Sequence, residues 1–322
     1  MLNKAIQLFQ QKLGHICSQN VPCKTFSYWK IGGPAALLVE PESINELATA
    51  IKLANTFEEV PYLVIGDGSN MLYDSEGFDG ILIKIGNKLS RMDIKGTTVI
   101  CEAGVWVPEI TYRCSHYGLT GIEHICGIPG RIGGLIYMNG GASRRSILEN
   151  TESIDLINKH GEIETVTKDD LIFSYRTSPF QNDPRIIARA TFKLSQSTRK
   201  AVRSEIRKIL ASRRSRFPRK LPNCGSVFLS NPNMYETIGP PGLAIEREGL
   251  KGTRKGDAQI SPQHANFIVN LGNATSDDVL YLIALCRHKV YESTGFKMDC
   301  EVRYLSKRGE LMQAHQQAEN SL

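Results

Sequence analysis

One stretch of the chain, "CGIPGRIGGLIYMNGGA" at residues 126–142, restricts the possible folds more than any other. It holds six glycines and one proline in seventeen positions. Glycine has no Cβ, so it adopts backbone conformations closed to other residues and allows another group to approach the main chain closely. The stretch therefore predicts loops whose backbone another group approaches at close range.

A second glycine-rich loop occurs in "VIGDGSNML", residues 64–72, at the end of the apolar run "PYLVIG", which we expect to be a buried strand. The backbone from Gly66 to Asn70 can turn sharply and expose consecutive N–H groups, an arrangement that binds phosphate oxygens. The Rossmann dinucleotide fingerprint fits poorly, because Met71 stands where its last glycine belongs. A single loop of this kind is commonly only a turn. Two such loops in one domain predict a diphosphate bound between them.

The spacing of apolar residues predicts short strands with a few helices between them. A first amphipathic helix at residues 1–14 lacks the continuous apolar run of a signal peptide. Ser43 and Glu46 predict a capping box at the start of the next helix. Further helices are expected at 106–116, 199–220 and 275–292, and strands at 35–40, 61–66, 80–85, 98–104, 152–158, 161–166, 185–194 and 300–305. This order lacks regular strand–helix alternation and predicts an α+β fold.

The same pattern predicts where the domains begin and end. We expect an N-terminal helix at residues 1–20, a first domain at 21–196 and a smaller α+β domain at 197–305. The segment "SQST", residues 195–198, separates the last strand of the first domain from a basic helix. After residue 305 we expect a polar, mobile tail, 306–322.

Composition excludes several classes of protein. No run of about 18 apolar residues could span a membrane. The eight cysteines include no CxxC pair, and the histidines have no ligand spacing beside them. A reduced cytoplasmic protein without a metal site is therefore the simplest interpretation.

Ten basic residues and one acidic residue, Glu205, lie in residues 199–220 of a chain whose net charge is +6. Val202, Ile206, Ile209 and Leu210 recur at helical spacing, which favours a helix with a solvated basic face. A nucleic-acid-binding arm would have a similar composition. A third interpretation is that the basic end of this helix borders a site for an anionic substrate.

Seven segments occur in the order and spacing of the UDP-N-acetylenolpyruvoylglucosamine reductase family, flavin enzymes of peptidoglycan precursor synthesis. They are "WKIGGPAALLVEPESINELATAIKLA", "VIGDGSNML", "GIEHICGIPGRIGG", "FSYRTSPF", "NCGSVF", "GLKGTRKGDAQISPQHANFIVN" and "CEVR". The resemblance covers about residues 20–305 and is to the compact type II branch, because the chain between "SYR" and "NCGSVF" is short. It implies a two-lobed FAD-binding domain of the vanillyl-alcohol-oxidase (PCMH) type, followed by a smaller α+β substrate domain.

The resemblance also implies the reaction and its residues. NADPH reduces a non-covalent FAD, and a hydride passes from N5 to C3 of the enolpyruvyl ether of UDP-N-acetylglucosamine, which gives UDP-N-acetylmuramate. Ser226 matches the proton donor to C2. Arg176 can bridge the carboxylate and the developing enolate with its planar fork, and Glu301 orients the same group. The residues expected at the FAD are Gly66, Gly68, Ser69, Asn70, Met71, Gly127, Ile128, Gly130, Gly133, Gly134, Asn139 and Gly141.

Substrate binding is expected to involve the polar groups of Asn231, Lys251, Gln259, His264 and Arg303. Two departures from the family pattern leave the substrate preference open. The family generally has a basic residue after "SVF", whereas this chain has Leu229 and Ser230. Ser143 stands where an aromatic ring is common.

Three functions from different classes compete. The reductase explains every motif above. Another FAD-dependent oxidoreductase of the same superfamily, with a different substrate, explains the two glycine loops but not the set Ser226, Arg176 and Glu301. A nucleic-acid-binding protein explains only residues 199–220. We therefore expect a monomeric enzyme that binds the nucleotide sugar and NADPH, with no nucleic-acid or membrane partner.

Overall fold

The computed structural model describes residues 1–230 and 232–319. Its packing divides the chain into two compact units. Unit 1 comprises Met1–Ser18, Leu37–Asp67 and Ile81–Arg213, and unit 2 comprises Gln19–Ala36, Gly68–Gly80 and Arg214–Leu322. The chain leaves unit 1 in the middle of the first glycine loop, between Asp67 and Gly68. The domain boundaries that we placed at residues 20, 196 and 305 stay predictions, because the units describe packing only.

Unit 1 contains a five-stranded antiparallel sheet with the strand order β10-β9-β11-β7-β6. Its strands are β6 (Met92–Lys95), β7 (Thr98–Glu102), β9 (Thr151–Ile157), β10 (Ile163–Thr167) and β11 (Ile186–Lys193). A two-stranded pair joins β8 (Leu119–Thr120) to β12 (Ser195–Gln196). A four-stranded sheet has the order β1-β2-β5-β3, with β1 (Cys17–Pro22), β2 (Pro34–Val39), β3 (Tyr62–Ile65) and β5 (Phe78–Lys84). Parts of β1, β2 and β5 belong to unit 2.

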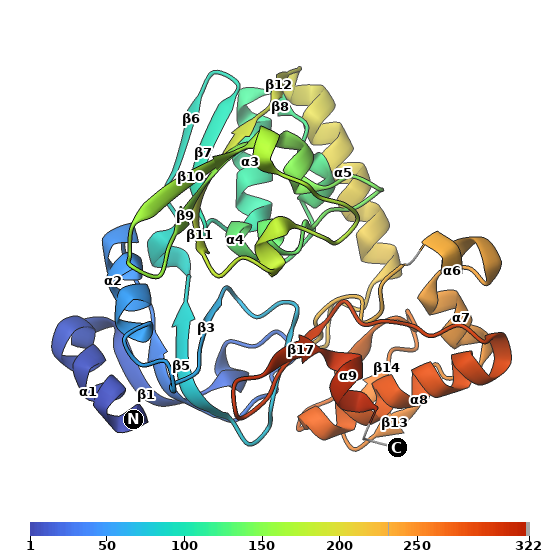
Figure 1. Ribbon diagram of the computed structural model, residues 1–322. Helices are drawn as coiled ribbons and strands as arrows, with labels where there is room; N and C mark the ends of the chain where they lie inside the picture. The colour runs from blue at the N-terminus through green and yellow to red at the C-terminus, as the bar shows by residue number, and fades with distance from the viewer. Residues whose placement is uncertain (231, 320–322) are drawn as a thin grey trace. The chain divides into compact units, whose positions relative to one another are not determined.

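The helices of unit 1 are α1 (Leu2–Leu13), α2 (Ile44–Ala54), α3 (Val107–Tyr117), α4 (Ile132–Tyr137) and α5 (Arg199–Arg216), the last of which continues into unit 2 at Arg214. Figure 1 shows α3 and α4 on one face of the five-stranded sheet. Helix α2 begins after Ser43, whose side chain accepts a hydrogen bond from the Glu46 amide at 3.2 Å. Helix α4 begins inside the glycine-rich stretch, which our sequence analysis treated as loop.

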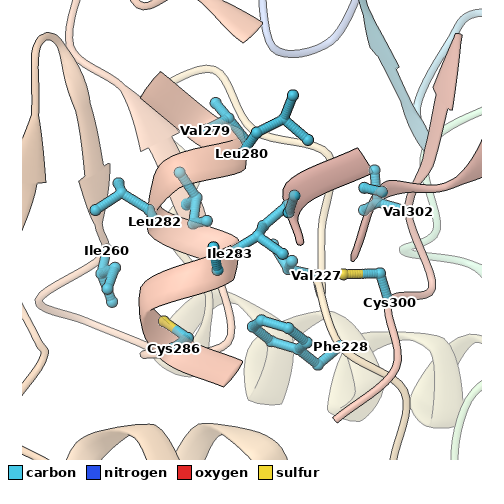
Figure 2. Packing of buried hydrophobic residues seen from close by; sticks show 14 of the residues in the cluster. Val227, Phe228, Ile260, Val279, Leu280, Leu282, Ile283, Cys286, Cys300 and Val302 are labelled. Atoms are coloured by element: carbon cyan, nitrogen blue, oxygen red, sulfur yellow. The ribbon is translucent and has the colours of Figure 1, made fainter. Parts of the chain in front are cut away.

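Unit 2 is built around α8 (Ser276–Thr294). Figure 2 shows Ile283 of this helix beside Val227, and both belong to one buried cluster with Val279, Leu280, Phe228, Cys300 and Val302. Two three-stranded sheets have the orders β13-β14-β15 and β17-β16-β4. The remaining elements are β4 (Met71–Tyr73), α6 (Pro232–Thr237), α7 (Pro241–Arg247), β13 (Arg254–Lys255), β14 (Ala258–Ile260), β15 (Ile268–Asn270), β16 (Arg303–Leu305), β17 (Leu311–Gln313) and α9 (Ala314–Ala318).

The structure corrects three expectations. The tail after residue 305 is not simply polar and mobile, because it forms β17 and α9, and α9 buries Ala314 and Ala318. The strand β3 is mostly half-buried, with only Ile65 buried. The basic helix ends at Arg216, and Val202 is its buried residue.

No helix in the described part of the chain is long and apolar enough to cross a membrane. The same residues contain no group of three or more His, Cys, Asp or Glu side chains that could bind a metal ion. Each of the eight cysteines is a free thiol.

Candidate functional site

In unit 2, the second half of the first glycine loop lies against the segment that carries Ser226. The Cys224 thiol donates toward the carbonyl oxygens of Gly68 and Met71, at 3.6 and 3.4 Å. Burial raises the pKa of this thiol to about 12, so it stays protonated and can donate. Two residues further on, Ser226 is half-buried beside the core residue Val227. Cys224 therefore attaches the serine segment to the loop.

The segment that carries Glu301 is hydrogen-bonded to the segment that carries Ser226. The Glu301 amide donates to Val227 O at 2.8 Å, and Phe228 and Cys300 form an antiparallel bridge. Because Cys300 and Val302 lie in the core, the alternation of side chains along an extended chain keeps Glu301, which stands between them, out of it. Ser226 and Glu301 are each half-buried.

Asn70 joins the first glycine loop to the Glu301 segment with two hydrogen bonds. Its side-chain Nδ2 donates to the main-chain carbonyl of Glu301 at 3.0 Å, and its own main-chain carbonyl accepts from the Arg303 amide at 3.1 Å. The strands that follow run parallel, with Arg303 opposite Met71. Unit 2 thus brings together Gly68 to Met71, Ser226, Glu301 and Arg303. The sequence assigned Asn70 to the cofactor, and its side chain amide is engaged with the protein.

The C-terminal elements β17 and α9 support this segment from its other side. The amide of Cys300 donates to Nδ1 of His315 at 3.0 Å, and the amide of Ala314 donates to Val302 O at 2.9 Å. Nδ1 can accept only when it carries no proton. Burial lowers the pKa of His315, which favours this neutral state. His315 was not among the predicted site residues, because a polar, mobile tail was expected after residue 305.

In unit 1, an ion pair connects the two glycine loops. The Arg131 Nε lies 2.7 Å from Asp67 Oδ2, and the two side chains are only 10% and 15% exposed. Arg131 also donates to Gly104 O at 2.9 Å and to Asn87 Oδ1. Its aliphatic atoms cover Gly66, where an added Cβ would come within 3.2 Å of the Arg131 Cγ. Neither Asp67 nor Arg131 was among the predicted site residues, although both stand inside the two loops.

Several glycines of the long stretch are required by the packing of the chain itself. An added Cβ at Gly127 would lie 2.5 Å from the Arg213 side chain, and one at Gly141 would lie 1.9 Å from Arg145 O. These contacts explain part of the glycine content without any ligand. Gly130 has φ +123°, where L residues are rarely found.

The other end of the stretch leaves space beside its backbone. An added Cβ at Gly134 would meet no heavy atom of the described chain within 4 Å, so this residue faces open space. The amides of Ile132 and Gly133 donate to Val105 O and Ala103 O, which leaves Gly134 as the open part of the first turn of α4. Ile128 precedes this turn, and its amide donates to Ile125 O. These observations agree with a cofactor lying across Gly134.

Asn139 and Cys126 lie at the two ends of this region. Asn139 is 1% exposed, and its Oδ1 has no hydrogen-bond partner among the described residues, while its Nδ2 donates to Ser174 O at 2.7 Å. An acceptor buried in this way suits a donor on a ligand.

Cys126 is 4% exposed, and its thiol is directed to Ile206 O of α5 at 4.0 Å. Ser69 lies between Gly68 and Asn70 in the first loop.

Arg176 belongs to unit 1 and is half-buried. It has φ +55°, in the left-handed region, and its Nη2 donates to Gly141 O at 2.9 Å. Thus Gly141, which we assigned to the cofactor, contacts the guanidinium. The three predicted catalytic residues are therefore divided, with Arg176 in unit 1 and Ser226 and Glu301 in unit 2.

Three of the predicted substrate residues, Lys251, Gln259 and His264, have partners within unit 2. Lys251 Nζ lies 2.6 Å from Glu246 Oε1, and Gln259 Nε2 donates to Gly252 O at 3.0 Å. His264 packs against Phe217 and Phe267, which also stack on each other. Its Nδ1 accepts from the Asn266 amide at 3.2 Å, and burial lowers its pKa. The Nε of Arg303 is buried, with no hydrogen-bond partner in the described part of the chain. Asn231 lies outside the described residues.

Comparison with known proteins assigns two parts of the chain to known domain families. Residues 35–167 match the model of an FAD-binding domain, and residues 217–305 match the C-terminal domain of UDP-N-acetylenolpyruvoylglucosamine reductase. The first match and the two glycine loops define the class: the protein is an FAD-dependent oxidoreductase. The α+β fold, with an FAD-binding domain followed by a smaller domain, is confirmed.

Full-length relatives identify the family. UDP-N-acetylenolpyruvoylglucosamine reductase 1 of Corynebacterium glutamicum is 45% identical over 93% of this chain and 89% of its own length. The reductase of Carboxydothermus hydrogenoformans is 38% identical over 89% of this chain and 93% of its own. The crystal structure of the reductase from Thermus caldophilus aligns with a TM-score of 0.74 at 30% identity, over 88% of this chain and 97% of that one. The chain belongs to the UDP-N-acetylenolpyruvoylglucosamine reductase family.

Proposed function

We propose that the protein uses NADPH and FAD to reduce the enolpyruvyl ether of UDP-N-acetylglucosamine to UDP-N-acetylmuramate. The observation that carries the proposal is the junction in unit 2, where Asn70 and Cys224 attach a cofactor loop to the segments with Glu301 and Ser226. A residue that protonates a carbon beside the flavin must be fixed relative to it, because proton transfer needs hydrogen-bond reach. These contacts supply that constraint within one unit.

Each catalytic residue has a defined task in this proposal. FAD, when bound, supplies the hydride that reaches C3 of the enolpyruvyl group. Ser226 gives its proton to C2, where the developing enolate is far more basic than a serine hydroxyl. Arg176 neutralises the charge on the enolate and the carboxylate with two parallel N–H groups. Glu301 holds the carboxylate in the orientation that places C2 over the serine.

The two loops would bind the cofactor unequally. Gly134 and the buried Oδ1 of Asn139 are the groups whose surroundings suit direct contact with FAD. The space beside Gly127 is filled by the Arg213 side chain, and Gly141 contacts Arg145 O and the Arg176 guanidinium. These two glycines therefore contribute to the shape of the loop. The remaining predicted contacts are Gly66, Gly68, Ser69, Asn70, Met71, Ile128, Gly130 and Gly133.

For the nucleotide sugar, Arg303 is the best supported of the predicted contacts. Its Nε is buried without a partner in the described chain, and burial of an unpartnered cationic donor is costly. A phosphate or carboxylate oxygen would satisfy it. Lys251, Gln259, His264 and Asn231 complete the proposed set. We further propose that the enzyme acts as a monomer in the cytoplasm.

A related FAD-dependent oxidoreductase with another substrate is the alternative, favoured by Leu229, Ser230 and Ser143 at positions where the family pattern has other residues. The deciding experiment measures NADPH oxidation by the holoenzyme with and without the enolpyruvyl nucleotide sugar. We expect oxidation to depend on the sugar and to yield UDP-N-acetylmuramate. NADPH consumption that is unaffected by the sugar would refute the proposal.

A further inference from the structure

Arg176 is held in a backbone conformation that it would not adopt unaided. It lies in a tight turn in which the amides and carbonyls of Ser174 and Thr177 exchange two hydrogen bonds, of 3.2 and 3.0 Å. Its φ of +55° is uncommon for a residue with a side chain. Such conformations persist where the surrounding structure fixes them, and they cluster at functional sites. The groups that fix this turn therefore decide where the guanidinium lies.

Gln181 is one of the side chains that join the turn to the rest of unit 1, beside Asn139, whose Nδ2 donates to Ser174 O. The Gln181 Nε2 donates to Arg176 O at 2.9 Å and to Tyr137 O at 3.2 Å. Ser178 Oγ donates to the same Tyr137 carbonyl at 2.6 Å. Both protons of one amide are thus committed, one to the residue that carries the guanidinium and one to the C-terminal residue of α4.

Helix α4 connects this anchor to the cofactor loop. It begins at Ile132, within the glycine-rich stretch, and ends at Tyr137 after only six residues. Gly133 at its start packs on Ala103, 3.0 Å from where its Cβ would be. A short, well-anchored helix transmits position between its ends because its backbone hydrogen bonds leave few soft dihedrals. The Arg176 turn is therefore tied to the loop that faces the cofactor.

We propose that Gln181 is a positioning residue, which holds Arg176 in register with the cofactor loop through Tyr137 O. The inference rests on the proposed function, in which Arg176 contacts the enolpyruvyl group. Gln181 itself touches no substrate. A displacement of the guanidinium by about 1 Å can slow catalysis by about 100-fold, so the loss of this anchor should be visible in the chemical step.

The test replaces the amide by an isosteric group that cannot donate. In Gln181→Glu, a carboxylate would face two carbonyl oxygens, and the turn would be released. Flavin reduction by NADPH and reoxidation by the enolpyruvyl nucleotide sugar are measured separately by stopped flow on FAD-loaded enzyme. We expect reduction within about twofold of wild type and reoxidation slowed at least tenfold, because Arg176 is needed only in the second step.

Two further measurements separate positioning from general damage. A protonated carboxyl regains one O–H donor, so the deficit of Gln181→Glu in reoxidation should shrink as the pH falls from 8 toward 5.5. Gln196→Glu is the matched control, because Gln196 Nε2 likewise donates to two carbonyls, Tyr117 O and Ser197 O, on the exposed surface. We expect this control to behave as wild type in both half-reactions.

The outcomes are distinguishable. If wild-type reduced enzyme is not reoxidised by the nucleotide sugar, the proposed function fails and this inference with it. If wild type is active and Gln181→Glu matches Gln196→Glu, or slows both half-reactions equally, the positioning role alone is wrong. Should Gln181→Glu lose FAD, Gln181→Met provides an uncharged side chain without donors, and the same comparison of half-reactions decides.

Discussion

The ion pair between Asp67 and Arg131 allows a quantitative test of how the two glycine loops are joined. Asp67→Asn keeps the shape of the side chain and removes its charge. Breaking a buried ion pair on one side costs roughly 3–5 kcal/mol, because an uncompensated charge remains. Arg131 keeps its hydrogen bonds to Gly104 O and to Asn87, which argues for the lower end of this range. We therefore expect the free energy of unfolding to fall by about 3 kcal/mol.

The assay is urea unfolding of the FAD-free protein, followed by fluorescence, with the midpoint and slope fitted for each variant. Glu76→Gln is the control, since Glu76 pairs with Lys307 at 3.1 Å but the two side chains are 73% and 43% exposed. An exposed pair contributes about 0–1 kcal/mol. The double variant Asp67→Asn/Arg131→Met removes the orphaned charge and should recover part of the loss. Equal effects of Asp67→Asn and Glu76→Gln would show that the pair does not join the loops energetically.

Four other predictions concern the chemistry and the pH dependence. Ser226→Ala should leave flavin reduction by NADPH within a few fold of wild type and slow reoxidation by about 10²- to 10⁴-fold; equal loss in both half-reactions would indicate a structural role. Arg176→Ala and Glu301→Gln should act non-additively on reoxidation, because both serve one carboxylate–enolate group, and additivity within about 0.5 kcal/mol would contradict this. FAD should be released into the supernatant on acid precipitation, because the Cys126 thiol is directed to α5; flavin in the pellet would show a covalent link. His124 is 3% exposed, and burial, with a smaller effect of a nearby arginine, lowers its pKa to about 4. In the unfolded chain the His124 imidazole is protonated below about pH 6.5, so the free energy of unfolding should fall by about 3 kcal/mol as the pH drops from 7 to 4. His124→Gln should weaken this pH dependence in urea unfolding experiments at each pH. An unchanged pH dependence would show that His124 is not its source.

Local sequence determined most elements of secondary structure. Helix α1 buries Ile6, Phe9 and Leu13 as their spacing predicts, and Ser43 caps α2 through its side chain. These features depend on neighbours within one or two helical turns, so the sequence contains the whole cause. The family, the FAD-binding domain and the α+β class also followed from motifs whose spacing is fixed along the chain.

The structure of the tail could not be predicted in this way. Residues after 305 are polar on average, and β17 gains its stability by pairing with β16. The burial of Ala314 and Ala318 depends on packing within unit 2 that no local pattern reveals. For the same reason, His315 became recognisable as a support for the Glu301 segment only through its contact with Cys300.

The reasons for individual glycines were also decided by tertiary structure. From sequence, Gly127 and Gly141 were both assigned to the cofactor, but Gly127 makes room for Arg213 and Gly141 for Arg145 O. A missing Cβ permits close approach to the backbone and does not show what, if anything, approaches. The sequence thus determined where the backbone can be approached closely. The folded chain decided whether a side chain, a carbonyl or open space meets it, because those neighbours are distant along the chain.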